Sequence, residues 1–158
     1  MIKWLFKKKK YPLNCKGISP KDVRDFVGVR KPAITQEVDW RKWERIIENQ
    51  GSTNSCVAQG DEAMIAVPIN FLRGTDNSDG SKMTDLDAFD HYKDICDTFY
   101  GGNQSKGSHP RDGMKRLKDR GIVEIHPNKG QIHKTKRYWK CETLEGIQNA
   151  LLTTGPAV

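Results

Sequence analysis

The sequence contains no apolar run that approaches the roughly 20 residues needed to cross a bilayer, so it gives no sign of a transmembrane helix. The apolar start from Met1 to Phe6 is too short for the core of a signal peptide, and no cleavage region follows it. Apolar residues make up only 35% of the 158 residues, whereas charged residues make up 30%. We therefore expect a soluble protein that is not exported by this route, with a small core or a core that a partner completes.

Closely spaced cysteines are also absent. The chain holds four cysteines, which are Cys15, Cys56, Cys96 and Cys141. No two of them form a Cys-x-x-Cys pair, and the histidines at positions 91, 109, 126 and 133 do not supply the spacing of a zinc site. We therefore expect no metal site and no cofactor.

The net charge is +7, but it is unevenly spread. Residues 1–31 carry ten basic and two acidic side chains, residues 32–110 carry seven basic and thirteen acidic ones, and residues 111–140 carry ten basic and three acidic ones. An acidic segment between basic flanks can hold parts of a protein together or attract a polyanion. Solvated surface charge is the simpler interpretation.

Two basic segments could contact a partner. An aromatic and apolar start precedes Lys7–Lys10, a pattern that suits an anionic membrane surface as well as a disordered arm. Residues 129–140 interleave five basic side chains with His133, Tyr138 and Trp139, which can bind phosphates and stack on bases. Because no recognised nucleic-acid fold surrounds this segment, binding to nucleic acid is kept as an alternative only.

The stretch around Cys56 carries the chemistry of the chain. A run of small, turn-forming residues from Asn49 ends at this cysteine, and the sequence then becomes helical. Asn54 or Ser55 should cap the helix, which places Cys56 in its first turn. There the helix dipole favours a thiolate, the form that attacks carbonyl groups. A small buried cysteine in a helix contact is the competing interpretation.

Residue patterns predict further elements. The helix beside Cys56 should reach about Val67, where Pro68 kinks or ends it. Capping residues and apolar spacing predict four more helices, at residues 19–27, 84–98, 110–120 and from 143. Thr84 should cap the helix at 84–98. The basic residues of the helix at 110–120, Arg116 among them, should form a solvated face, and residues 122–125 a short strand. Spacings of three and four predict a helical face packed against the Cys56 helix, made of Trp40, Trp43, Ile46 and Ile47.

Five segments resemble landmarks of papain-like cysteine peptidases, in the same order. The run Gln50-Gly-Ser-x-x-Ser-Cys56-x-Ala resembles the nucleophile segment Gln-Gly-x-Cys-Gly-Ser-Cys-Trp-Ala of that family. The other matching segments are Val38–Arg41, Met83–Asp87, Gly107–Pro110 and, at the end, Gly155–Val158. Several landmarks in order are more specific than one glutamine-to-cysteine spacing.

The resemblance implies an α+β papain-like fold, with the helical subdomain nearly whole and only the start of the β-barrel subdomain. Residues 38–158 would form this domain, and residues 1–37 a basic N-terminal extension that serves as an arm or a short pro-segment. Cys56 matches the nucleophile, and Gln50 matches the glutamine that stabilises the oxyanion. The residues matched to the binding of an extended peptide are Gly107, Ser108 and His109, although Ser108 stands where the family has a second glycine.

In the family, the catalytic histidine and the asparagine that orients it follow the Gly-Pro-Val segment, whereas this sequence ends at Val158. A thiolate needs a base, and the leaving amine needs a proton. We therefore expect a cysteine peptidase for peptide or protein substrates that is inactive as this chain alone. A missing C-terminal segment or a second chain would supply the histidine. The alternative is a non-catalytic binding protein that holds a protein or polyanionic partner in its cleft or on its basic flanks.

Many secreted members of the family carry a disulfide at the places that Thr53 and Ser105 occupy here. The loss of this bridge suits a reducing compartment, so the resemblance favours a cytoplasmic location.

Overall fold

The computed structural model describes residues 26–27, 39–45, 49–136, 138–140, 146–147 and 150. Most of the predicted helices at 19–27 and from residue 143 lie outside these ranges, as do Ile46 and Ile47. The helix at 19–27 is wrong at its end, because Phe26–Val27 forms strand β1, which pairs in parallel with β5 (Trp139–Lys140). None of the helices in the described ranges has the length and apolar character to span a membrane.

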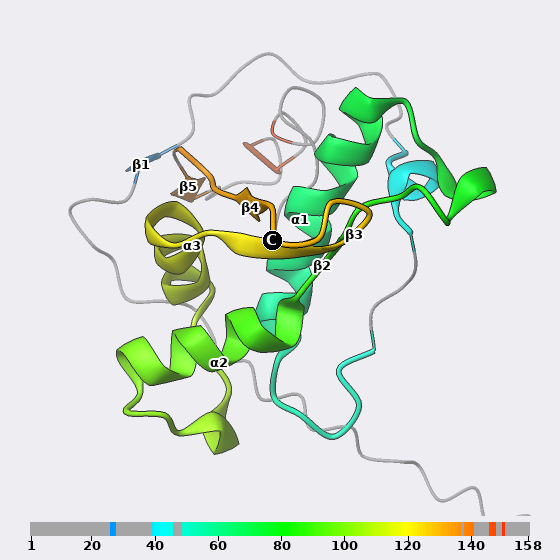
Figure 1. Cartoon of the computed structure of the whole chain (residues 1–158). Coiled ribbons are helices and arrows are strands. Elements are labelled where there is room, and N and C mark those ends of the chain that lie inside the picture. The colour runs from blue at the N-terminus through cyan, green and yellow to red at the C-terminus, as the bar shows by residue number, and fades with distance from the viewer. Residues whose placement is uncertain are drawn as a thin grey trace, which may run out of the picture.

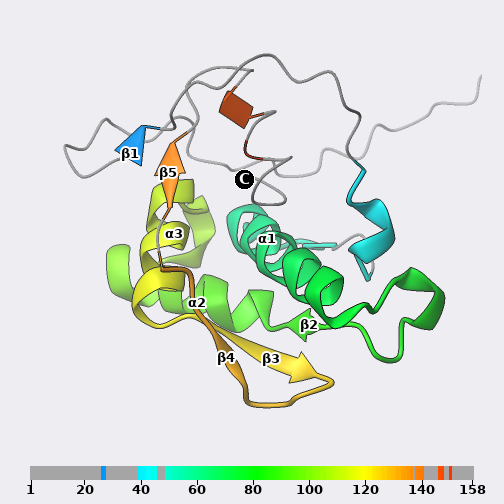
Figure 2. The same ribbon diagram turned by 90° about the horizontal axis from the view of Figure 1, so that it is seen from above.

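Three helices and a small antiparallel sheet form the main body of the described chain (Figure 1). The helices are α1 (Cys56–Arg73), α2 (Ala88–Phe99) and α3 (Pro110–Asp119). The sheet has the order β2-β3-β4, and its strands are β2 (Asp85–Leu86), β3 (Ile122–His126) and β4 (Ile132–His133). Single 3-10 turns lie between these elements: η1 (Arg41–Trp43), η2 (Asn77–Asp79) and η3 (Gln104–Lys106). In Figure 2 the β3–β4 hairpin lies on the opposite side of the helices from β1 and β5.

Helix α1 is longer than the sequence predicts. It continues through Pro68 to Arg73 and ends at Gly74, whose φ of +67° is left-handed. Proline removes one hydrogen bond of the helix, but tertiary contacts beyond it outweigh that loss. The side chain of Asn70 donates to the carbonyl of Trp43 at 3.0 Å and accepts from the N–H of Thr84 at 2.7 Å. The predicted end at Val67 is therefore wrong.

Two aromatic contacts join the segment before α1 to that helix. Trp40 and Trp43 meet the ring of Phe71 edge to face, with centroid distances of 5.5 and 5.3 Å. The prediction that both tryptophans pack against the Cys56 helix is confirmed. The local backbone is the single turn η1 instead of a longer helix.

Helix α2 begins later than predicted. Asp87 caps it by accepting from the N–H of Asp90 at 2.9 Å, and the residues before it form β2. Thr84 does not serve as the cap because it is buried and its N–H and hydroxyl bond to Asn70 and Arg73. Tertiary bonds to α1 have taken the groups that a local cap would have used.

Among the described residues, two buried apolar clusters lie along the two halves of α1. One contains Ala58 with Tyr92, Ile95 and Cys96 of α2. The other contains Ala66, Leu86, Leu117 and Ile122. Burying a side chain of this size contributes about 1.5–3 kcal/mol, so these clusters fix α1 between α2, α3 and the sheet.

The basic face predicted for α3 is wrong at one residue. Arg116 is only 9% exposed, and its Nε donates to Asp94 of α2 at 2.8 Å. The helix otherwise follows the prediction: Pro110 is its first residue, and the chain leaves it at Gly121 with a φ of +84°.

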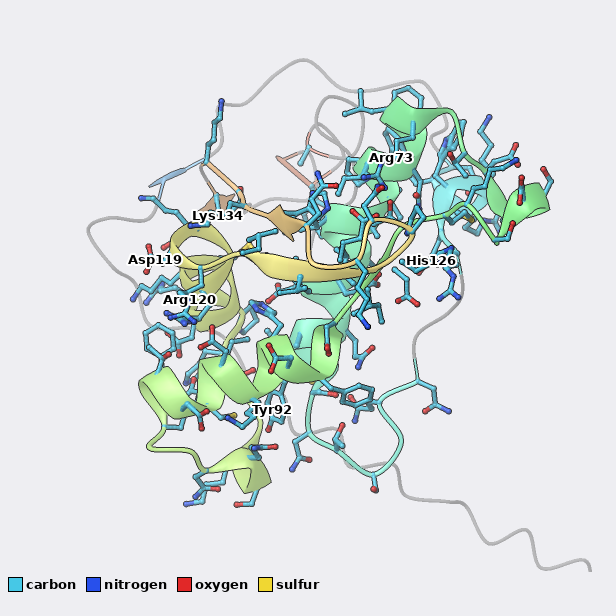
Figure 3. The ribbon with its side chains drawn as sticks, viewed as in Figure 1. Arg73, Tyr92, Asp119, Arg120, His126 and Lys134 are labelled. Carbon is cyan, nitrogen blue, oxygen red and sulfur yellow. The ribbon has the colours of Figure 1, made fainter. Side chains whose placement is uncertain are left out.

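A buried carboxylate joins the end of α1 to the β3–β4 hairpin. Glu124 of β3 is fully buried and accepts from Arg73 at 2.9 and 3.1 Å and from Asn128 N–H at 3.0 Å, and it contacts His133 Nε2 at 2.6 Å. Figure 3 shows Arg73 at this end of α1. Burial raises the pKa of Glu124, but the hydrogen bonds from Arg73 and His133 outweigh burial and lower it to about 2.

We expect Glu124→Gln to remove an acid-sensitive part of the stability. The native pKa of about 2 lies below the ordinary 4.5, so the charged Glu124 stabilises the fold above about pH 4.5, and this contribution is lost as the pH falls toward 2. This difference in the pKa of Glu124 between the unfolded and native states corresponds to about 3 kcal/mol of unfolding free energy. Urea unfolding at pH 7, 5 and 3 should show that wild type and variant differ most at pH 7 and converge at acid pH. Asp119→Asn, which removes an exposed carboxylate, is the control, and a difference independent of pH would contradict the assignment.

The three helices meet at a buried pair, Asp61 of α1 and His91 of α2. Asp61 Oδ2 lies 3.1 Å from His91 Nε2, and both side chains are fully buried. Burial raises the pKa of Asp61, and the hydrogen bond from His91 opposes this. Gly113 of α3 packs directly on the pair, because a Cβ there would lie 2.2 Å from Asp61 Oδ2 and 3.0 Å from a methyl of Val57.

We expect Gly113→Ala to destabilise the protein although alanine favours helices. The gain in helix propensity is about 1 kcal/mol, while overpacking costs about 1–3 kcal/mol. In this case the added methyl must also move Asp61 away from His91. Gly80→Ala is the matched control, since nothing lies within 4 Å of its Cβ position and its φ of −56° suits any residue. Thermal unfolding should show a lower midpoint for Gly113→Ala only, and equal midpoints would contradict the close packing.

Candidate active site

Cys56 is the first residue of α1, as predicted, and it is half-buried. Ser55 stands at the N-cap, but its side chain makes no capping hydrogen bond. Its hydroxyl instead lies 2.7 Å from that of Thr53 and 3.4 Å from the amide nitrogen of Gln59. The predicted helix start is thus confirmed, whereas the predicted capping bond is not made. The cysteine occupies the positive end of the helix dipole, which favours a thiolate.

Gln50 lies in a tight turn ahead of Cys56. Its carbonyl accepts from the N–H and the hydroxyl of Thr53 at 3.1 and 2.7 Å, and its side-chain amide donates to the carbonyl of Thr53 at 3.0 Å. Gly51 supplies the positive φ of +58° that this turn requires. The amide proposed for the oxyanion therefore bonds to its own turn in this structure.

The loop between α2 and α3 is tied to the segment before Cys56. The amide of Asn54 donates to the carbonyls of Gln104 and Ser105 at 3.2 and 2.9 Å. The hydroxyl of Tyr92 donates to the same Gln104 carbonyl at 2.7 Å. The two bonds from Asn54 join the segments that many secreted papain-like peptidases link by a disulfide, at the places of Thr53 and Ser105.

The three residues matched to peptide binding follow this tied turn. Gly107 and Ser108 are buried, and His109 is half-buried at the N-cap of α3. The N–H of His109 donates to the hydroxyl of Tyr100 at 3.1 Å, and that hydroxyl donates to Asp112 at 2.5 Å. Burial and Asp112 raise the pKa of Tyr100 to about 12. Two side-chain atoms here are buried without a hydrogen-bond partner, Ser108 Oγ and His109 Nδ1.

Tyr92 is the residue that sequence reasoning missed. Its place on the apolar face of α2 predicts a core side chain, and it is indeed only 2% exposed. Burial raises its pKa, and so do Cys96, through a hydrogen bond, and the nearby charge of Cys56. Its hydroxyl bonds to the Gln104 carbonyl of the loop between α2 and α3. The apolar spacing of α2 predicts that the ring is buried, but it does not predict which group the hydroxyl contacts.

The other histidines in the described ranges have structural partners. His91 pairs with Asp61, His133 with Glu124, and His126 Nε2 lies 2.5 Å from the carbonyl of Ser81. Among the described residues, no group of three or more histidine, cysteine or acidic side chains is placed to hold a metal ion.

A hollow of about 290 Å³ lies on another face of α2, between that helix and the β3–β4 hairpin. Its lining includes Asp90, Lys93, Arg120 and Ile132. No residue matched to peptide chemistry lines it. Figure 3 shows Arg120 on this side of the molecule.

Comparison with known proteins supports the fold. No family model matches the sequence, and no curated protein matches it either. A solved structure with a papain-like fold, from work on the limited antibody cross reactivity between the mite allergens Blo t 1 and Der p 1, is similar to this chain, with a TM-score of 0.57 and 14% sequence identity. The match covers 90% of this chain and 49% of that chain, so this chain spans about half the length of its neighbour. The protein has a papain-like α+β fold, and the predicted fold class is confirmed.

We expect Asn54→Ala to loosen the loop between α2 and α3. Two hydrogen bonds worth about 1 kcal/mol each are lost, so amide exchange at Ser105–Gly107 should quicken by about tenfold or more. Asn54→Asp keeps the size but turns an oxygen toward two carbonyl oxygens, and it should have a larger effect. Hydrogen exchange followed by mass spectrometry measures both variants against Asn77→Ala, an exposed control. Unchanged exchange in Asn54→Ala would show that the loop is held by other contacts.

Proposed function

We propose that this papain-like fold carries cysteine peptidase chemistry, with Cys56 as the nucleophile. The observation that supports it most is the half-buried thiol at the first residue of α1, beside a loop that Asn54 ties to the same segment. A helix start favours the thiolate, and the loop that Asn54 holds leads directly into the residues matched to peptide binding.

In this proposal the Cys56 thiolate attacks the scissile carbonyl carbon, and the carbonyl π electrons move to the oxygen. The backbone N–H of Cys56 and the side-chain amide of Gln50 donate to this oxyanion, for which the amide must turn away from Thr53. When the tetrahedral intermediate collapses, the C–N bond breaks and the amine leaves with a proton from a histidine, which first took that proton from the thiol. Gly107, Ser108 and His109 hold the extended substrate.

The histidine and the asparagine that orients it would come from the second subdomain. This chain spans about half of the neighbouring structure, and in the family these two residues belong to the part that follows. We propose that a C-terminal segment or a second chain supplies them. Peptide or protein substrates are the proposed partners.

Two observations favour the alternative of a non-catalytic binding protein. The amide of Gln50 bonds to Thr53, and Ser108 is fully enclosed where the family has a glycine whose backbone meets the substrate. A fold of this kind without an activated thiol could still hold a protein or a polyanionic partner.

The pH dependence of Cys56 alkylation decides between the two. An ordinary thiol reacts with iodoacetamide more than about a hundredfold more slowly at pH 6 than at pH 9, because little thiolate remains. We expect the alkylation rate of Cys56 to fall by less than about tenfold between pH 9 and pH 6. Limited access to the thiol affects both rates equally, so it cancels in this ratio. Peptide mass spectrometry follows Cys56 beside Cys15 and Cys141, and Cys56→Ser confirms the assigned peptide. If the alkylation rate of Cys56 falls as much as the rates of Cys15 and Cys141, the chain is better explained as a binding protein.

A further inference from the structure

Tyr92 of α2 bonds to the candidate peptide-binding loop. Its hydroxyl donates to the carbonyl of Gln104 at 2.7 Å, and the amide of Asn54 donates to the same carbonyl at 3.2 Å. Gln104 begins the turn η3 and Gly107 follows its end, and the tyrosine is almost completely buried. One buried hydroxyl therefore holds the start of the segment Gln104–Gly107, and Figure 3 shows that its side chain comes from α2.

The conformation of Gly107 makes this contact important. Its φ of +69° and ψ of −169° fall in a region that only glycine adopts readily. Tyr92 holds the start of η3, and this conformation fixes the backbone at its end. The two together set the direction that the backbone of Gly107 faces.

Tyr92 also packs in one apolar cluster with Ala58, which lies in the same turn of α1 as the candidate nucleophile. Burial raises the pKa of Tyr92 most, and Cys96 and the charge of Cys56 raise it further. The phenol therefore remains a protonated donor throughout the neutral range. It adds no negative charge beside the thiolate.

We propose that Tyr92 is a positioning residue of the peptide site: its hydroxyl holds the carbonyl of Gln104, so that the turn presents the backbone of Gly107 to a peptide bound beside Cys56. This inference rests on the proposed function, and it names a residue that the resemblance does not assign. Tyr92 itself touches no reacting atom.

The test compares two alkylating probes on the full chain. Iodoacetamide needs only the thiolate, whereas a dipeptide that carries the same iodoacetamide group also needs the peptide site. In both reactions a C–S bond forms and iodide leaves, so the ratio of their rates at Cys56 reports peptide binding alone. We expect the wild type to prefer the dipeptide probe by more than about tenfold. Tyr92→Phe should lose most of this preference, with the iodoacetamide rate unchanged within about twofold.

Ile95→Val is the matched control, because Ile95 lies in the same apolar cluster as Tyr92. It weakens the packing of α2 without touching a loop hydrogen bond, so it should keep the preference for the dipeptide probe. Amide exchange at Gly107 gives a second measurement. It should be slow in the wild type and in Ile95→Val, and fast in Tyr92→Phe.

The outcomes separate this inference from the proposed function. If Cys56 shows the pH dependence of an ordinary thiol, the proposed function fails. If Cys56 is activated but Tyr92→Phe keeps both the probe preference and the slow Gly107 exchange, or if the wild type shows no probe preference, the role of Tyr92 is overturned. Should Tyr92→Phe not fold, fast exchange of Gly107 in the wild type would also overturn it.

Discussion

The burial of α1 is the constraint on which the other elements depend. One half of the helix packs on α2 around Ala58, and the other half packs on the sheet and α3 around Ala66. The helix begins at Cys56 and ends at Arg73. The packing that holds α1 therefore also places the thiol at one end and the partner of Glu124 at the other, and a change in core volume along the helix would reach both ends.

The buried carboxylates near the two ends of α1 differ in how completely they are hydrogen-bonded. Glu124, at the C-terminal end, receives hydrogen bonds from Arg73 and Asn128 and contacts His133, so its desolvation is well compensated. Asp61, nearer to Cys56, contacts His91, but Asp61 Oδ1 and His91 Nδ1 are buried without hydrogen-bond partners. Partly satisfied polar groups cost stability and tend to gather near functional sites. This contrast agrees with an anchoring role for the hairpin end and a functional role for the end that begins at Cys56.

Local sequence rules predicted the elements whose ends depend on local chemistry. The start of α1 at Cys56, Pro110 at the start of α3, Gly121 at its end and the strand that begins at Ile122 all follow from residues within a few positions. The rules failed where distant groups compete. Pro68 does not end α1, and Thr84 does not cap α2, because Asn70 and Arg73 of α1 bond to the chain around Thr84. In the site, the position of Cys56 was predictable, but the contacts of Tyr92 were not, because they depend on a loop twelve residues further on.

The way the loop is held bears on the site's chemistry. In the family a disulfide often joins these two segments, and such a bond responds to reductant. Here Asn54 and Tyr92 donate to backbone carbonyls of Gln104 and Ser105, and neither bond involves sulfur. The loop position therefore does not depend on the redox state, which leaves the thiol of Cys56 as the redox-sensitive group of this segment. An arrangement of this kind lets a papain-like fold keep the loop between α2 and α3 in place under reducing conditions, where a thiol also stays reactive.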